Sequence, residues 1–254
     1  MRKGYKLLNS GMLYAASTHF NHFANYRESA PGKTRAKAAL RSGVIYQEIG
    51  QLEESIVHLE KALLFMKDVH SPLLEGVIFR ELGRSSHLFA LRINPKVKKR
   101  REEREDKLDN AESYLYQSIE CFKELRKKRE KGFDDVSAIA IADLEAEIAI
   151  SRGTWGLIKF DRGEVGGRTD IENADKTLSD LGKKYELQLA ENLIRLMRVL
   201  PLRERAMLYE DRVHDLTTKS SPASTLRGPA RLTLFRASRR SHKAALKHGL
   251  PGWK

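Results

Sequence analysis

The sequence predicts an all-α fold, an α-solenoid of three to four helical hairpins closed by C-terminal capping helices. Composition is the first of three observations behind this prediction. The chain has 254 residues, of which 41% are hydrophobic and only 7% aromatic, and it contains seven prolines. The few prolines and aromatic residues point away from a disordered chain and from an aromatic-rich β-sandwich. The 32% of charged residues suits long solvated helices.

A recurring frame of two glycines is the second observation. The stretches "SGVIYQEIG" and "EGVIFRELG" match at Gly-Val-Ile-aromatic and again at the closing glycine. In chain order the copies are a weaker one at Gly11, Tyr14 and Thr18, then Gly43, Tyr46 and Gly50, then Gly76, Phe79 and Gly83, and finally Gly156, Lys159 and Gly163. The first three begin 32 and 33 residues apart, which indicates an internal repeat.

The third observation is that a helical pattern follows each of the three clearer frames. Small and apolar residues spaced four and then three positions apart line one face of a helix. The triplets are Ser55, Leu59 and Ala62; Ala111, Leu115 and Ser118; and Ala174, Leu178 and Leu181. The predicted unit is therefore helix, turn, helix. In such a unit the first glycine permits close approach of the second helix, and the second glycine ends the first helix in a left-handed conformation.

This unit resembles the tetratricopeptide repeat (TPR), a family with about 34 residues per unit and a glycine one turn before an aromatic residue on the first helix. The resemblance is best at Gly43–Ala62 and covers about 180 of the 254 residues. The chain departs from the family at the leading tryptophan, where Ala39 and Arg152 stand, and at the closing proline, where Lys67 stands. The resemblance implies a divergent TPR-like protein with a surface for binding a partner.

The remaining segments complete the predicted organisation. It consists of a TPR-like helical repeat domain at 1–216 with an insertion at 94–110, a linker at 217–230, and a basic C-terminal tail at 231–254. The amphipathic pattern of Lys183–Leu200, which Pro201 interrupts and the following residues resume, predicts a capping helix pair. The insertion is a charge run that we expect to form a solvated helix extension or a loop.

The net charge of +13 suggests an anionic partner. Nine lysines and arginines and no acid lie from Lys219 to Lys254, so the residues before them are only mildly basic. The candidate nucleic-acid-binding residues of the tail are Arg236, Arg239, Arg240, Lys243 and Lys247. The tail has three other interpretations, which are contact with a membrane surface, a disordered solubilising end, and a segment that folds back onto the repeats.

No catalytic constellation stands out, so the chain is predicted not to be an enzyme and to need no cofactor. His19 and His22 stand three apart but lack a nearby carboxylate, so no metal site is expected. The run Gly32-Lys33-Thr34 lacks the earlier glycine of a phosphate loop and predicts an ordinary helix start. The single cysteine, Cys121, is expected to be a small buried residue of a helix.

A binding surface remains as the functional hypothesis. In helix-pair solenoids the first helices line a groove that receives a peptide or a helix. Aligning the copies places Leu40, Val44, Gln47, Leu73, Val77, Arg80, Leu157 and Phe160 on that side, with Leu8 and Met12 from the weak copy. The alternative is that these residues pack helix against helix. The predicted function is a protein-interaction scaffold, with nucleic-acid association through the tail as the alternative.

The location of the protein is predicted from what the sequence lacks. It contains no run of 18 apolar residues, so no transmembrane helix is expected. The first residues lack the long apolar core of a secretory signal, which favours an intracellular, cytoplasmic protein. The same residues are basic and contain no acid before Glu28, so a mitochondrial transit peptide is the lesser alternative.

Overall fold

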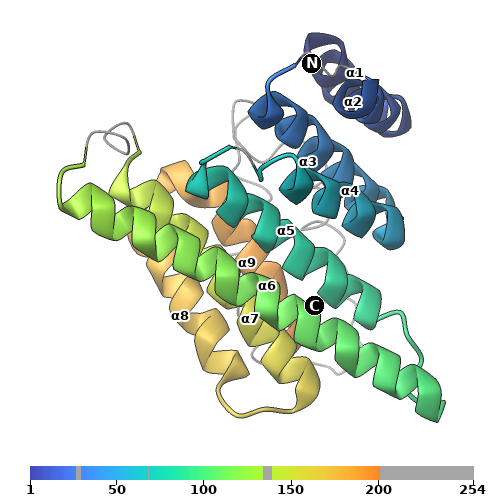
Figure 1. Ribbon diagram of the computed structural model, residues 1–254. Coiled ribbons are helices and arrows are strands. Elements are labelled where there is room, and N and C mark those ends of the chain that lie inside the picture. Colours follow the sequence, from blue (N-terminus) through green and yellow to red (C-terminus); the bar gives the residue numbers. More distant parts are fainter. Residues whose placement is uncertain (27–29, 68, 134–138, 201–254) are drawn as a thin grey trace, which may run out of the picture. The chain divides into compact units, whose positions relative to one another are not determined.

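The computed structural model describes residues 1–26, 30–67, 69–133 and 139–200, and every regular element in these ranges is helical (Figure 1). The all-α prediction is thereby confirmed. The elements are α1 (Arg2–Asn9), α2 (Leu13–Tyr26), α3 (Gly32–Ile49), α4 (Leu52–Leu64), α5 (Pro72–Ala90), α6 (Lys98–Glu130), α7 (Ile141–Arg162), α8 (Gly167–Asp180), the 3₁₀ helix η2 (Lys183–Tyr185) and α9 (Glu186–Val199).

The chain divides into two compact units. The first, Met1–Ser151, holds α1 to α6 and the first part of α7; the second begins at Arg152 and holds the rest of α7, α8, η2 and α9. The predicted linker, the basic tail and the helix expected after Pro201 lie outside the described residues.

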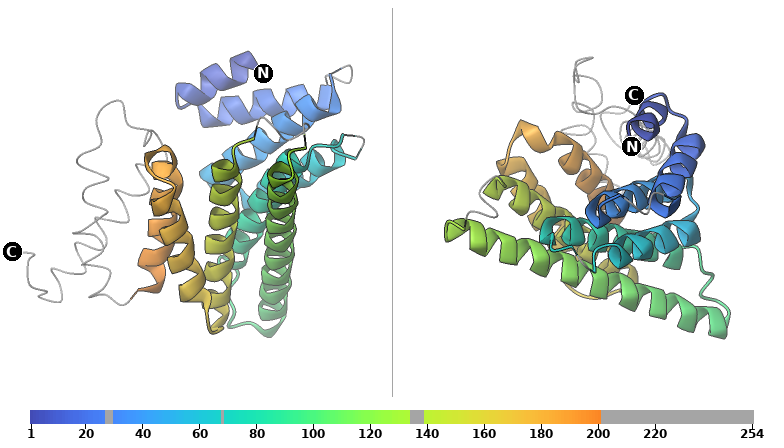
Figure 2. Two further views of the ribbon diagram at one scale, coloured as in Figure 1. Left: turned by 90° about the vertical axis from the view of Figure 1, so that its left-hand side faces the viewer. Right: turned by 45° about the horizontal axis from the view of Figure 1, so that its top comes forward.

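Neighbouring helices of the first unit pack in pairs. Helix α1 packs on α2, α3 on α4, and α5 on α6, and successive pairs touch through α2 with α3 and α4 with α5. Figure 2 shows the first of these pairs, α1 and α2, lying beside α3. The predicted helix, turn, helix units are therefore present as adjacent helix pairs.

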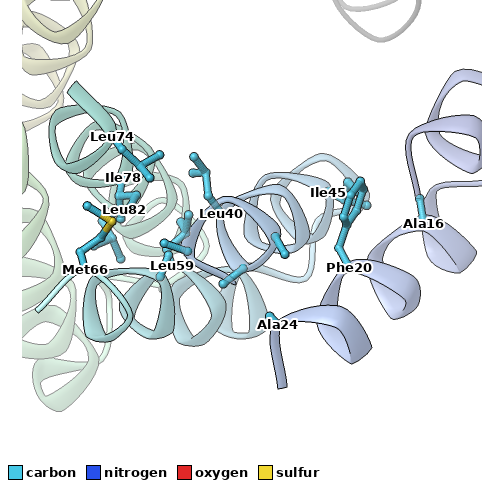
Figure 3. Close-up of a cluster of buried hydrophobic side chains, with 14 residues drawn as sticks. Ala16, Phe20, Ala24, Leu40, Ile45, Leu59, Met66, Leu74, Ile78 and Leu82 are labelled. Carbon is cyan, nitrogen blue, oxygen red and sulfur yellow. The ribbon is translucent and has the colours of Figure 1, made fainter. Parts of the chain in front are cut away.

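One apolar cluster joins the first three pairs. It contains fully buried side chains from α2, α4 and α5, including Phe20, Leu59, Ile78 and Leu82. Figure 3 shows these elements, with α3, turning their apolar side chains into the spaces between them. Burying one such side chain contributes about 1.5–3 kcal/mol, so the cluster supplies much of the stability of this unit.

Both expected roles of the glycine frame are confirmed in the α3–α4 pair. A Cβ on Gly43 would lie 2.7 Å from Leu59 Cγ and 3.1 Å from the Ser55 carbonyl oxygen, so only glycine permits this approach. Gly50 ends α3 with φ at +84°, and the amide of Gln51 donates to the Tyr46 carbonyl across it. This left-handed ending satisfies carbonyls that the helix leaves free.

The predicted register of the next pair is wrong. Gly83 lies inside α5 rather than at its end, and a Cβ there would lie 2.6 Å from Leu115 Cγ and 3.0 Å from the Ala111 carbonyl oxygen. These contacts match those of Gly43 with α4. Gly83 is thus the structural equivalent of Gly43, while Gly76 packs against Phe122 farther along α6.

The weak first copy is displaced in the same way. Gly11 lies after the end of α1 with φ at +78°, so it is the turn glycine of the α1–α2 pair rather than its close-contact glycine. Gly4, seven residues earlier, takes the close-contact role, because a Cβ there would lie 2.8 Å from the Phe20 ring. The true frame of this pair is therefore Gly4 and Gly11.

The second unit repeats the contact between α7 and α8. A Cβ on Gly156 would lie 2.6 Å from the Gly167 carbonyl oxygen and 3.0 Å from Ile171 Cγ1, and Gly163 ends α7 with φ at +76°. Ala174 and Leu178 of the predicted triplet are buried, and they lie farther along α8 than the residues that Gly156 meets.

The predicted insertion is largely the beginning of α6. This helix has 33 residues and a length of about 50 Å, whereas α4 has 13 residues. No residue of α6 before Leu108 is buried. Lys107 lies over the Phe89 ring near the end of α5. Most residues of α6 before Lys107 are exposed, and we refer to residues 98–106 as the solvated extension of α6.

Buried serines link successive helix pairs. The Ser42 hydroxyl lies 3.3 Å from the Ser17 carbonyl oxygen between α3 and α2. The Ser118 and Ser151 hydroxyls lie 3.1 Å apart between α6 and α7. Small hydroxyl side chains allow these helices to approach while their polar groups remain hydrogen-bonded.

Candidate functional site

The candidate site is the exposed side of α3 and α5, the first helices of two successive pairs. Helix α3 exposes one narrow stripe, made of Lys33, Lys37, Arg41, Val44 and Glu48, of which Val44 is half-buried. Because side chains three and four positions apart share a helix face, this stripe runs along the helix axis. The other faces of α3 pack against neighbouring helices.

The exposed stripe of α5 continues this surface. It contains Leu73, which is 37% exposed, and the half-buried Val77, Arg80 and Arg84. Val44 and Val77 pack against the same apolar cluster, and α3 and α5 touch directly. We refer to the partly exposed residues Val44, Leu73, Val77 and Arg80 as the α3–α5 face.

Two of the predicted groove residues on α3 are buried. Leu40 belongs to the apolar cluster, and Figure 3 shows it with Leu74 and Ile78 of α5. Gln47 is only 5% exposed, and its amide nitrogen donates to the Ser85 hydroxyl at 2.8 Å. Both side chains hold α3 against α5, so their contribution to a ligand surface is indirect.

Arg80 is held in an ion-pair network. Its guanidinium binds Glu81 at 2.8 Å and also pairs with Glu147 of α7. Arg84 lies 3.8 Å from Glu48 and 3.9 Å from Glu81. Partial burial strengthens such pairs relative to fully exposed ones, so this network fixes the charged edge of the α3–α5 face.

The last two predicted groove residues belong to the second unit. Leu157 is buried in the apolar cluster of that unit, which also contains Ile171 and Leu193. Phe160 is 41% exposed on α7. Leu157 therefore packs the second unit, and Phe160 is the member of this pair that faces solvent.

Other exposed apolar residues escaped the sequence reasoning. Tyr14 of α2 and Val57 of α4 are 62% and 60% exposed, and Tyr116 of α6 is also exposed. They lie on second helices, away from the expected groove side. Single exposed apolar residues of this kind are common on protein surfaces, so they do not define a site by themselves.

Burial shifts the pKa values of side chains on α4 and α6. Burial lowers the pKa of His58, whose ring stacks on Tyr46 with 4.9 Å between centroids. Burial also raises the pKa of the Cys121 thiol to about 11, and Glu75 and Glu124 act in the same direction. A thiol with so high a pKa is a poor nucleophile at neutral pH.

Neither a metal-ion site nor a membrane-spanning helix is found in the described part of the chain. No three His, Cys, Asp or Glu side chains in this part of the chain are grouped to hold a metal ion. None of its helices combines the length and apolar character needed to cross a membrane. The predicted nucleic-acid-binding residues Arg236, Arg239, Arg240, Lys243 and Lys247 lie outside the described residues.

No protein-family model matches the chain, and no curated protein matches it.

Proposed function

We propose that this protein is a non-enzymatic interaction scaffold, built of TPR-like helix pairs stacked as an α-solenoid, that binds a segment of a partner protein on the α3–α5 face. One observation carries the proposal. The partly exposed apolar side chains Val44, Leu73 and Val77 lie on two adjacent first helices, above a continuous apolar cluster. Apolar residues presented from rigid helices are suitable anchors for a peptide or a helix.

The recurring glycine contact supports the repeat character of the scaffold. In the α3–α4 and α5–α6 pairs, Gly43 and Gly83 meet a carbonyl oxygen and, four residues later, a leucine side chain of the second helix. Gly156 makes the corresponding contacts with Gly167 and Ile171. Repeats that share one packing geometry tend to expose equivalent faces, on which an extended partner can lie.

The polar edge of the face supports the same function. Arg80 and Arg84 are already paired with carboxylates, so a partner would meet a preformed network rather than unpaired buried charges. A central apolar strip with a polar rim is the usual composition of a protein interface.

The test is a selection of peptides from a random phage-displayed library on the full-length protein. Selected peptides should bind Leu73→Arg and Val77→Arg at least about tenfold more weakly than the wild type, because a buried cation would replace an apolar anchor. Val57→Arg is the matched control, since Val57 is an exposed valine of α4 outside the face. Thermal melts would verify that all three variants fold.

Two outcomes would contradict the proposal. One is the recovery of no peptide above background. The other is equal binding of the selected peptides to wild type, Leu73→Arg and Val77→Arg, with all variants folded. Loss of binding in Val57→Arg alone would place the interface on α4 and would reject the α3–α5 face.

A further inference from the structure

Positive charge is concentrated at the start of the chain as well as in the tail. Met1 to Gln47 contains eight lysines and arginines and a single acid, Glu28. With this segment and the tail set aside, acids outnumber bases in the rest of the chain. The net charge therefore has a second source, which the structure places largely on α1 and α3.

Six of these cations lie on exposed helix surfaces. Arg2, Lys3 and Lys6 are exposed on α1, and Lys33, Lys37 and Arg41 are exposed on α3. We refer to these six residues as the cationic surface. On α3 the charges are spaced one turn, or about 6 Å, apart along the helix. Arg35 is not among them, because it donates to the Ala24 carbonyl and lies over the Phe65 ring.

The two helices meet at Tyr5. The Arg41 guanidinium lies 5.9 Å from the centroid of the Tyr5 ring, so the exposed stripes of α1 and α3 adjoin. Tyr5 is 37% exposed, and its ring makes an edge contact with the buried Phe20. The cationic surface therefore contains an aromatic ring that is held in place from below and accessible from outside.

None of the six cations forms an ion pair within the part of the chain that the structure describes. The nearest acid along α3, Glu48, is paired instead with Arg84. Six like charges on adjoining helices repel one another, and nothing in the described residues neutralises them. An anionic ligand would remove this repulsion, which gives the surface an electrostatic preference for a polyanion.

The side chains of the cationic surface favour a nucleic acid over an anionic membrane. A membrane would require an exposed apolar side on α1, but Leu7 and Leu8 pack against the core of the protein. Proteins that bind single-stranded nucleic acids combine aromatic side chains with cations, because bases stack on the aromatic rings while phosphates contact lysine and arginine. We propose that α1 and α3 bind a single-stranded nucleic acid, with phosphates along the cationic surface and a base on Tyr5.

This binding does not depend on the proposed function. The cationic surface adjoins the α3–α5 face on α3, but the two consist of different side chains. The proposal also differs from nucleic-acid binding by the tail, because it predicts that helices of the folded domain contribute most of the affinity.

The experiment measures binding of the full-length protein to a fluorescein-labelled 20-nucleotide oligouridylate by anisotropy at 50 and 200 mM NaCl. The test variant is K33E/K37E/R41E. The matched control is K98E/K99E/R101E, which makes the same charge change at exposed residues of α6. The test variant should weaken binding at least about tenfold more than the control, and reduce the salt slope by about two through the loss of three phosphate contacts. Circular dichroism would show that both variants fold.

The two variants also distinguish this proposal from attraction by overall charge. Equal loss in both variants, or no loss in either, would overturn it. So would tight binding of poly-glutamate without binding of the oligonucleotide, because the surface would then serve an acidic protein. Crosslinking with a 4-thiouridine oligonucleotide gives an independent result. Crosslinks in α1 or α3, including Tyr5, are expected, and crosslinks confined to residues 231–254 would reject the proposal.

Discussion

The hydroxyl oxygens of Ser55 and Ser85 lie 2.9 Å apart between α4 and α5, and both residues are fully buried. The Gln47 amide nitrogen donates to the same Ser85 hydroxyl at 2.8 Å. Three helices from two pairs are therefore joined by one small hydrogen-bonded group inside an otherwise apolar contact. Such groups contribute orientation as well as stability, because a shifted helix would leave polar atoms unpaired.

Replacing Ser85 with alanine should destabilise the protein by about 1–3 kcal/mol, because Gln47 and Ser55 would both lose their closest partner in a buried site. Urea unfolding measures this change. In the double-mutant cycle with Ser55→Ala, the two effects should be coupled by about 0.5 kcal/mol or more. Ser113→Ala, at an exposed serine of α6, is the control. Fully additive effects would show that the two hydroxyls do not interact.

Alanine at the close-contact glycines should also destabilise the protein. In Gly43→Ala and Gly83→Ala the added methyl group would overlap Leu59 or Leu115, which costs about 1–3 kcal/mol once the helices shift apart. Lys37→Ala, at an exposed position of α3, should change stability by less than about 0.5 kcal/mol. Thermal unfolding compares the three variants. A stabilised Gly83→Ala would contradict the corrected register.

Stability should fall at mildly acidic pH because of His58. Burial, followed by the charge of Lys61, lowers the pKa of this histidine, and Glu54 opposes the shift. The unfolded chain therefore takes up a proton near pH 6.5 that the folded chain does not, and the unfolded state gains stability as the pH falls below about 7. The loss should level off below the pKa of folded His58.

The measurement is the free energy of unfolding between pH 7.5 and 5.5. His58→Phe keeps an aromatic ring beside Tyr46 but has no proton to bind. Its stability should fall less than that of the wild type over this range. The same pH dependence in both proteins would assign it to other groups.

Cys121 should react slowly in the folded protein. Its pKa of about 11 lies two pH units above the reference value of 9.0, so the thiolate fraction at pH 8 is lower by about a hundredfold. Iodoacetamide labelling followed by mass spectrometry should be slow in buffer and fast in 8 M urea (about the concentration that unfolds most domains). Equal labelling rates in the two solutions would show that the folded protein neither shields the thiol nor raises its pKa.

The buried residues of the second helices were largely predicted correctly, because their spacing along the sequence is determined within a single helix. Ser55, Leu59 and Ala62 are fully buried, since a spacing of four and three places them on one helix face whatever the partner is. The same holds for the triplet that begins at Ala111. Patterns that a single helix determines can be found in the sequence.

The register of the pairs could not be found in the same way. Gly76 and Gly83 are seven residues apart, so they lie on one face of α5, and both are buried against α6. Either one satisfies the sequence frame, and only the contact with Ala111 and Leu115 shows which is equivalent to Gly43. Gln47 is a similar case, because its partner Ser85 is 38 residues away.

The cationic surface was missed for a different reason. The summed charge of the residues before Lys219 is small, because acids after Gln47 offset part of the positive charge of the first residues. Lys33 and Lys37 look unremarkable in that sum. Their exposure on one stripe and the absence of ion pairs among the described residues became evident only from the structure.

The solvated extension of α6 makes the connection before it suitable for inserting another domain or a tag. The crossing of α5 and α6 is fixed by Gly83 against Leu115, and the residues of α6 before Leu108 take no part in it. The connection between these helices can therefore be lengthened without changing how α5 and α6 pack against each other. A reporter domain or an affinity tag inserted near Pro95, which is exposed in the connection before α6, should therefore leave the packed part of α6 unchanged.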